Sequence, residues 1–394
     1  MARRGKLVIV LAAAASLLLA VALVGVLWAR SDGASGRRID DGTLHPAAGS
    51  FEPDETELTG CDGDFRCLEQ AFGNLAFRDG PGSAIRLFDD RIRNDPKVER
   101  NCHRIAHMIG SAALARFDGN VGRAFTAGSA ICSSGYYHGL LERAFAGVSS
   151  DQELARAAGR ICDEAEIKRT TYFHYQCIHG LGHGLMITTA YDLPYSLSVC
   201  DRLATSWAQA SCTGGVFMEN ISSSYGVKSR WLRDDNPVYP CDTVTSAHKQ
   251  YCYLMVTSRI LELNGYDWRA TATECSRVEG GWVDECFQSY GRDASGFSRQ
   301  NVARVLTLCR IAGEGQRECL YGAARDMGND YARGGAERAA GLCSQASTPL
   351  RDHCFFGVGT ILGTFGSASA GLGSVCRGVP RTYRPSCRRG AGET

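Results

Sequence analysis

Residues 177–186 read Cys-Ile-His-Gly-Leu-Gly-His-Gly-Leu-Met and contain two overlapping patterns. The first is Cys177 followed by Gly180 and Gly182, a Cys-x-x-Gly-x-small motif that returns at 319–324 and at 354–359. The second is the pair His179 and His183. These residues are four apart, so on a helix they share one face and lie about one turn apart, which suits two ligands of a metal ion. The first pattern predicts a repeated fold, and the second predicts a binding site.

Seven pairs of cysteines follow one another along the rest of the chain. Nine to fourteen residues separate the two members of each pair, and the first members of the last five pairs are 34, 34, 34 and 33 residues apart. A period of this size is typical of a two-helix unit, so we expect an all-α fold: an α-solenoid of repeats of about 34 residues with one disulfide per repeat. The pairs are Cys162 and Cys177, Cys200 and Cys212, Cys241 and Cys252, Cys275 and Cys286, Cys309 and Cys319, Cys343 and Cys354, and Cys376 and Cys387.

The unit that begins at Val302 shows how one repeat is expected to fold. Apolar residues at helical spacing predict a helix over 302–309, the sequence Gly313-Glu-Gly315 ends it, and a second helix is predicted over 316–327. A short turn then brings the end of one helix and the start of the next within the roughly 5 to 6 Å that a disulfide needs between Cα atoms. Each bridge would stabilise the fold by about 3 kcal/mol in the chain-entropy model.

Glycines that follow the second cysteine of a pair should destabilise the helix in which they lie. Glycine lowers helix propensity by about 1 kcal/mol relative to alanine. We therefore expect these glycines to allow a close approach between neighbouring helices.

Four cysteines remain after the seven pairs are assigned. By elimination Cys102 is expected to bond to Cys132, and Cys61 to Cys67. The alternative is that Cys102, at a predicted helix start where the pKa of a thiol falls, is a reactive thiolate or a ligand. An even total of eighteen cysteines indicates an oxidising compartment.

The regular cysteine pairs resemble those of tetratricopeptide-like proteins, especially secreted bacterial helical-repeat proteins in which one disulfide crosslinks every repeat. The resemblance covers roughly residues 160–390. It implies an elongated, curved α-solenoid used for binding, and it implies no reaction.

The N-terminus has the features of a membrane anchor. Residues 1–6 carry three positive charges and are expected to form a cytoplasmic tip, followed by 22 uncharged, apolar residues at 7–28. A membrane-spanning helix needs about 20 such residues, whereas the apolar core of a cleaved signal peptide has about 7 to 15. We therefore expect an uncleaved, single-pass signal anchor in the cell membrane, with a cleaved signal peptide as the alternative. The positive charges before the span place the rest of the chain outside the cytoplasm.

Composition supports a globular, exported domain after this anchor. A flexible linker is predicted over 29–60 and a Cys-rich helical-repeat domain over 61–394, with a His-rich part at 100–225 and plain repeats at 226–394. Hydrophobic residues make up 44% of the chain, enough for a core, and the abundance of Arg, Ala and Gly is typical of a bacterial protein. With 43 basic and 42 acidic residues and no basic stripe, the sequence argues against nucleic-acid binding.

Five histidines fall on three successive helices that are predicted to begin near Cys102, Cys132 and Cys177. If these helices stack, their histidines line one face. From Cys252 onward, equivalent positions carry no histidine. The predicted metal ligands are His103, His107, His138, His179 and His183.

Zinc or copper suits an all-imidazole site outside the cell, and nearby methionines at 108, 186 and 218 slightly favour copper. Haem held by two histidines is the alternative cofactor. Glu142 and Glu219 are candidates for a catalytic base or a fourth metal ligand.

Three functions follow from these patterns. The first is a membrane-anchored, extracytoplasmic helical-repeat protein with a histidine metal or haem centre. The second is a metal-dependent hydrolytic or oxidative enzyme that uses the same histidines. The third is a metal-free scaffold whose concave face binds a protein or an envelope polymer.

Overall fold

The structure, a computed structural model, describes residues 51–129, 131–145, 148, 151–168, 170–223, 228–329, 334–365 and 376–392. The described residues form helices and turns and no strands, as expected for an all-α protein. The predicted anchor at 7–28 lies outside the described residues. Within the described ranges, no helix combines the length and the apolar character that a membrane span requires.

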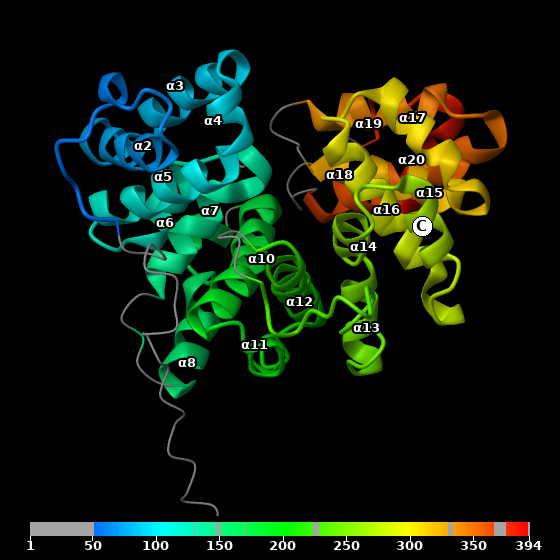
Figure 1. The fold of residues 1–394 in the computed structure, drawn as a ribbon, viewed down its shortest axis with the longest axis horizontal. Helices are drawn as coiled ribbons and strands as arrows, with labels where there is room; N and C mark the ends of the chain where they lie inside the picture. The colour runs from blue at the N-terminus through cyan, green and yellow to red at the C-terminus, as the bar shows by residue number, and fades with distance from the viewer. Residues whose placement is uncertain are drawn as a thin grey trace, which may run out of the picture.

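The first half of the described chain forms one lobe, drawn blue to green in Figure 1. Its elements, in chain order, are η2 (Leu58–Gly60), α2 (Phe65–Asp79), α3 (Pro81–Asn94), α4 (Pro96–Arg100), α5 (Cys102–Arg116), α6 (Val121–Thr126), α7 (Ile131–Ala144), α8 (Asp151–Ile161), α9 (Ala165–Lys168), α10 (Thr171–Thr188), α11 (Leu193–Cys200) and α12 (Ser206–Ile221).

The second half forms a lobe beside the first, drawn yellow-green to red in Figure 1. Its elements are α13 (Ser246–Tyr253), α14 (Thr257–Leu263), α15 (Trp268–Cys275), η3 (Gly280–Trp282), α16 (Val283–Phe297), α17 (Val302–Ile311), η4 (Gly313–Gly315), α18 (Gln316–Asn329), α19 (Gly335–Gln345), α20 (Thr348–Phe365), η7 (Arg381–Tyr383) and α21 (Arg384–Gly390).

The lobes touch at points that are distant in sequence. Helix α20 packs against α10, and Arg299 Nη1 lies 2.6 Å from Glu99 Oε1. The helical repeats thus form two lobes that are in contact with each other. The continuous, elongated solenoid stays a prediction.

The expected repeat unit is confirmed by α17 and α18, which η4 separates where the Gly-Glu-Gly sequence predicted a break. Helix α10 differs from expectation, because it begins six residues before Cys177, and α12 likewise begins six residues before Cys212. Thr170 and Thr205 explain these starts: their side chains accept hydrogen bonds from the backbone N–H groups of Phe173 and Ala208 and so satisfy donors that a helix start leaves unpaired.

Nine disulfides crosslink the described chain. Seven are the regular pairs, and the other two join Cys61 to Cys67 and Cys102 to Cys132, as expected by elimination. No free cysteine is present among the described residues, so the alternative of a reactive Cys102 thiolate is wrong.

Glycines let the helices of a pair cross with their backbones in contact. A Cβ atom on Gly139 of α7 would lie 2.0 Å from the carbonyl oxygen of His107, and one on Gly110 of α5 would lie 1.9 Å from that of Tyr136. Gly182 of α10 and Gly215 of α12 meet backbone oxygens at 2.2 and 2.0 Å in the same way. The expected role of these glycines is therefore confirmed. The same reciprocal contact recurs between α16 and α18 and between α20 and α21, at Gly291, Gly322, Gly359 and Gly390.

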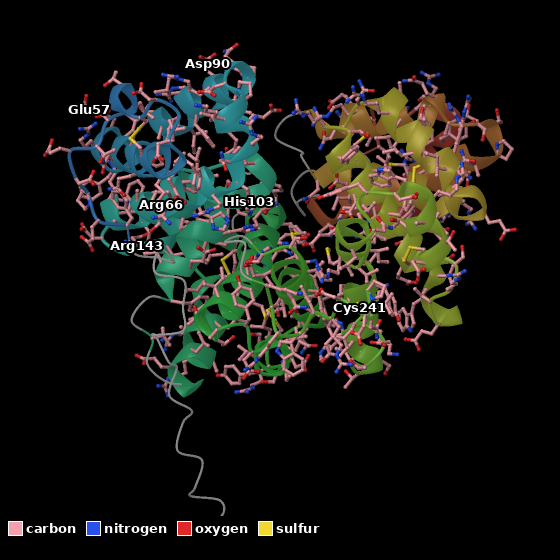
Figure 2. The ribbon with its side chains drawn as sticks, in the orientation of Figure 1. Glu57, Arg66, Asp90, His103, Arg143 and Cys241 are labelled. Carbon is pink, nitrogen blue, oxygen red and sulfur yellow. A yellow bond between two sulfur atoms is a disulfide. The ribbon has the colours of Figure 1, made fainter. Side chains whose placement is uncertain are left out.

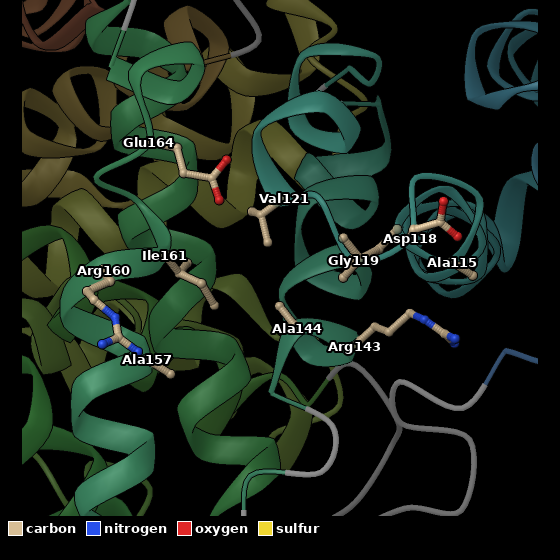
Figure 3. A pocket seen from close by; sticks show the side chains of 11 residues that line it. Ala115, Asp118, Gly119, Val121, Arg143, Ala144, Ala157, Arg160, Ile161 and Glu164 are labelled. Carbon is tan, nitrogen blue, oxygen red and sulfur yellow. The ribbon is translucent and has the colours of Figure 1, made fainter.

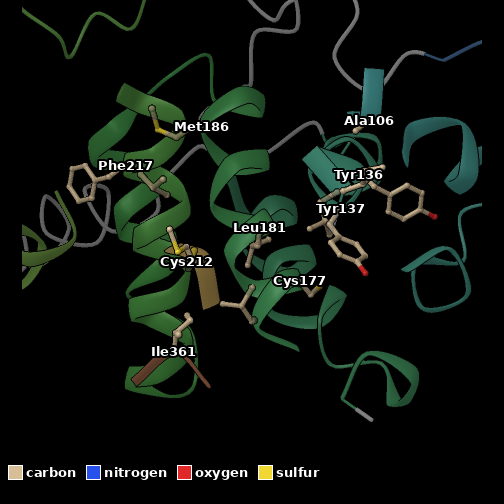
Figure 4. Close-up of a cluster of buried hydrophobic side chains, with 14 of the residues drawn as sticks. Ala106, Tyr136, Tyr137, Cys177, Leu181, Met186, Cys212, Phe217 and Ile361 are labelled. Carbon is tan, nitrogen blue, oxygen red and sulfur yellow. The ribbon is translucent and has the colours of Figure 1, made fainter. Parts of the chain in front are cut away.

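The hydrophobic core of the first lobe surrounds α10 (Figure 4). Leu181 of α10 is fully buried, as are Tyr136 of α7 on one side and Phe217 of α12 on the other. Burying a leucine side chain stabilises a fold by about 1.5 to 3 kcal/mol. This apolar packing fixes α7, α10 and α12 relative to one another, and the histidines occupy the same helices.

The packed domain starts before the boundary expected at residue 61. Phe51 is buried, with its ring centroid 5.8 Å from that of Phe77. Asp54 and Asn74 exchange hydrogen bonds: Asn74 Nδ2 donates to Asp54 Oδ1 at 2.7 Å, and Asp54 N donates to Asn74 Oδ1 at 3.1 Å. Residues 51–57 thus dock on α2.

Candidate metal centre

The five predicted histidines come together in the first lobe, where Figure 2 labels His103. Ligand nitrogens of His103, His107 and His138 lie within 4.8 Å of one another, and so do those of His138, His179 and His183. His138 of α7 therefore belongs to both triads and stands between the pair on α5 and the pair on α10. These are groups that can hold a metal ion.

On α5, both histidines are fixed through their Nδ1 atoms by groups on α7. His103 Nδ1 lies 2.7 Å from the carbonyl oxygen of Cys132, and His107 Nδ1 lies 2.9 Å from Glu142 Oε1. A carbonyl can only accept a hydrogen bond, so His103 Nδ1 carries the proton and His103 Nε2 presents a lone pair. His107 Nδ1 lies close to Glu142 Oε1, but these two atoms are not aligned for a hydrogen bond.

On α10, the same arrangement is repeated with groups on α12. His179 Nδ1 lies 3.3 Å from the carbonyl oxygen of Ser211, and His183 Nδ1 lies 2.9 Å from Glu219 Oε2. The first histidine of each pair thus meets a carbonyl near the neighbouring helix's cysteine, and the second meets a carboxylate further along that helix. The units α5–α7 and α10–α12 are two copies of one half-site.

The two half-sites differ in whether the second helix carries a histidine. His138 lies four residues before Glu142, whereas Gly215 lies four residues before Glu219. Because Gly215 is also where α10 and α12 touch, an imidazole has no room there. The two half-sites therefore contain a single central histidine.

Two imidazole nitrogens face each other in the first triad. His103 Nε2 and His107 Nε2 are 3.0 Å apart, so a proton on His107 Nε2 can be donated to His103 Nε2. A metal ion that replaces this proton would be held by both nitrogens. Ligands at about 2.0 to 2.1 Å from a zinc ion are separated by a similar distance.

The histidines are desolvated by the surrounding core. His107, His138 and His183 are 1 to 2% exposed, and His179 is 8% exposed, whereas His103 is partly exposed. Desolvation, with the repulsion of neighbouring imidazoles, lowers the pKa of His103, His179 and His183 to about 3, and that of His138 falls well below its usual value for the same reasons. These four rings are therefore neutral at neutral pH, the form that binds a metal.

Both nitrogens of the central ring lack a hydrogen-bond partner among the described residues. His138 Nδ1 and Nε2 are buried without one, and so is His183 Nε2. A buried neutral imidazole normally satisfies its N–H group, because an unpaired buried donor costs about 1 to 3 kcal/mol. These atoms point to a ligand.

Glu142 and Glu219 lie behind the histidines, on the Nδ1 side. Glu219 also accepts a hydrogen bond from Tyr191 Oη at 2.7 Å. Carboxylates in such positions orient metal-binding histidines and raise their basicity. Their contacts fit this positioning role rather than the expected role of base or fourth ligand.

Tyr191 and the Ser211 carbonyl were missed by the sequence analysis. Tyr191 adopts a left-handed backbone conformation with φ of +59°, which costs roughly 1 to 2 kcal/mol for a non-glycine residue. No pattern in the sequence connects a tyrosine in a turn after α10 with a carboxylate on α12. Tyr175 stacks on His179 with ring centroids 5.7 Å apart.

The pair His138 and His183 does not suit haem, and two of the nearby methionines lie in packed surroundings. The rings of His138 and His183 stack with centroids 3.9 Å apart, which leaves no space for a flat macrocycle between them. Met186 is buried in the hydrophobic core (Figure 4), and Met108 packs toward Gly73 of α2. The donor set is therefore one of imidazoles.

A separate pocket of about 540 Å³ lies beside α5, α7 and α8 (Figure 3). Asp118, Arg143, Arg160 and Glu164 line it together with apolar residues, and none of the five histidines does. Arg143 Nη1 donates to the carbonyl oxygen of Phe51 at 2.8 Å, and Glu164 Oε2 accepts from Gly122 N at 2.7 Å. These charged groups hold neighbouring segments, and they form no metal-binding set.

No family model, curated protein or solved structure matches this chain.

Proposed function

We propose that this protein is a membrane-anchored, extracytoplasmic helical-repeat protein that binds a transition-metal ion through its buried histidines. Zinc is the expected occupant, because neutral imidazoles supply every ligand, and copper is the next candidate. The nine disulfides support an oxidising compartment. The anchor and the location rest on the sequence of residues 1–28.

One observation carries the proposal. His103 Nε2 and His107 Nε2 oppose each other at 3.0 Å, and both nitrogens of the neighbouring His138 are buried without a hydrogen-bond partner. A metal ion that replaces the proton between the two Nε2 atoms would gain His138 as a third imidazole ligand. Three protein ligands leave one position of a tetrahedral ion open for an exogenous ligand.

Metal analysis of the full-length chain tests the proposal. The protein is purified in detergent, oxidised and without an affinity His-tag, loaded with Zn²⁺ or Cu²⁺, desalted and analysed for bound metal. We expect tight binding that is lost in the double variant His107→Ala, His183→Ala, which removes one ligand from each triad. A wild-type protein that retains neither metal would overturn the proposal.

A matched control separates the site from surface histidines. His248 and His353 contact Asp201 and Glu318 instead of the cluster. The double variant His248→Ala, His353→Ala should keep the wild-type metal content. Circular dichroism shows whether each variant is folded.

A second candidate function is recognition of an envelope polysaccharide. Tyr266 and Phe297 are 55% and 59% exposed, and their rings stack with centroids 5.9 Å apart. They border a pocket of about 610 Å³ that Ser258, Arg259 and Asp293 also line. Aromatic faces beside polar groups suit the alternating apolar faces and hydroxyl groups of sugars.

Co-sedimentation with purified cell-wall polysaccharide tests this candidate. The variant Tyr266→Ala, Phe297→Ala should bind at least tenfold more weakly than wild type, whereas Leu87→Ala, at another exposed apolar residue, should bind equally well. Equal binding by all three proteins, or no binding by wild type, would exclude it.

A further inference from the structure

The two triads share His138, which raises the question of how many ions the centre holds. Zinc–nitrogen bonds of about 2.0 to 2.1 Å limit the separation of two ligand atoms on one ion to roughly 4 Å. Even at the wider limit of 4.8 Å, the described histidines group only as two sets of three, joined at His138. One ion therefore cannot engage all five histidines, and two ions are needed.

The central ring lies between the two pairs. Its centroid lies 5.3 and 5.5 Å from those of His103 and His107, and 6.2 and 3.9 Å from those of His179 and His183. The two nitrogens of an imidazole are on different edges of the ring. Both nitrogens of His138 are buried and without a hydrogen-bond partner.

The histidine pair on α5 and the histidine pair on α10 have the same kind of contacts at their Nδ1 atoms. Each pair has one Nδ1 atom on a backbone carbonyl and one on a carboxylate. Such outer contacts fix the ring orientation of a metal ligand. A centre for a single ion would need these orienting contacts on only one of the two histidine pairs.

From these contacts we infer that the centre is dinuclear: one ion is held by His103, His107 and His138, a second by His138, His179 and His183, and the imidazolate of His138 bridges them. The rings of His138 and His183 are stacked with centroids 3.9 Å apart, so one of them turns when the second ion binds, because a metal ion lies in the plane of its imidazole ligand. This inference rests on the proposed metal-binding function and extends it. When the second metal–nitrogen bond forms, the ring N–H bond of His138 breaks and the proton leaves to solvent. The bridging imidazolate, with the carboxylates of Glu142 and Glu219, places three negative charges beside two divalent ions.

The two ions differ in access to solvent. His103 is partly exposed, whereas His138, His179 and His183 are buried. The ion on the α5 side is therefore the one that exchanges faster and that an external ligand reaches first.

Copper loading with electron paramagnetic resonance tests the bridge, since two Cu²⁺ ions joined by an imidazolate couple magnetically. The full-length chain is loaded with Cu²⁺, desalted, and measured for copper per chain and for spins per copper. We expect two coppers per chain and markedly fewer than two uncoupled spins. The double variants His103→Ala, His107→Ala and His179→Ala, His183→Ala should each hold one copper with a full, uncoupled spin.

The other outcomes separate the two hypotheses. No retained metal would overturn both the proposed function and the bridge. One copper per wild-type chain at saturation, or two coppers with two uncoupled spins, would overturn the bridge and leave metal binding intact. His353→Ala should match wild type in both measurements, and a lower copper content in that variant would assign the second copper to a surface site and overturn the bridge.

Discussion

Glu142 Oε1 lies 2.9 Å from His107 Nδ1, and the same distance separates Glu219 Oε2 from His183 Nδ1 in the neighbouring helix pair. Both carboxylates are almost fully buried. A buried carboxylate needs such a partner, because an unpaired charge in a protein interior is costly. Each contact holds the opposite nitrogen of its histidine toward the centre of the cluster.

Replacing either carboxylate should therefore weaken metal binding without removing a ligand. We expect Glu142→Gln and Glu219→Gln each to lower zinc affinity by about 10- to 100-fold, as for other groups that orient metal ligands. Competition with a chromophoric chelator measures the affinity. The exposed Glu55→Gln is the control, and unchanged affinity in both site variants would contradict the positioning role.

Gly139 should be intolerant of a side chain. A methyl group there would meet the His107 carbonyl oxygen at 2.0 Å, and neither backbone can move without separating α5 from α7. We expect Gly139→Ala to lower the free energy of unfolding by about 1 to 3 kcal/mol and to weaken metal binding.

Gly159 of α8 provides the matched control, because nothing lies within 4 Å of a Cβ at that position. Gly159→Ala should raise the free energy of unfolding by about 0.5 to 1 kcal/mol through helix propensity alone. Denaturant unfolding of the oxidised proteins measures both changes. Equal effects of the two substitutions would rule out the close helix crossing.

Two disulfides should have equal effects on stability and different effects on the metal site. Cys200–Cys212 closes a sequence separation of 12 and Cys309–Cys319 one of 10. Removing either pair by alanine substitution should therefore cost about 3 kcal/mol. Cys212 follows Ser211, whose carbonyl positions His179.

Only the loss of Cys200–Cys212 should also reduce zinc affinity. Thermal unfolding and chelator competition on both variants make the comparison. A similar loss of affinity in the Cys309→Ala, Cys319→Ala protein would show that general destabilisation, and not the position of Ser211, is responsible.

The contribution of the docked residues 51–57 to stability should decrease at acid pH. Hydrogen bonds from the Asn74 side chain and from the Thr56 backbone lower the pKa of Asp54 from 3.8 to about 2. A lowered carboxyl pKa stabilises the folded state above the unfolded pKa, and this contribution is lost as the pH falls from 3.8 toward 2. The difference in unfolding free energy between wild type and Asp54→Ala should shrink over that window. A difference that stays constant between about pH 5 and pH 2 would contradict this assignment.

The cysteine period and the glycines predicted much of the fold, because both act locally. A disulfide across a short turn constrains residues that are close in sequence, so α17, η4 and α18 lie near their expected positions. A helix start at Cys177 was placed too late, because α10 and α12 are each started by a threonine cap seven residues before the cysteine.

The histidine cluster was predicted because its ligands fall at related offsets on successive helices. The positions of Glu142 and Glu219 behind the histidines were not predicted. Helical spacing does not show whether a carboxylate faces a metal ion directly or faces the Nδ1 atom of a histidine that binds the ion. Tyr191 reaches Glu219 only through a turn with a left-handed backbone. Such contacts depend on the tertiary packing of α10 against α12.

The glycine crossings have a mechanical consequence for the first lobe. Backbone contact locks α5 to α7 and α10 to α12, whereas α7 meets α10 through side chains such as Leu141 and Phe145, which lie against Gly180 and Gly184. The looser interface is thus the joint between two rigid pairs, and the histidines span that joint. Metal bound at this joint would connect the two helix pairs, so that they unfold together in one cooperative step. Without metal the two pairs would unfold separately, as two steps in a single-molecule pulling trace.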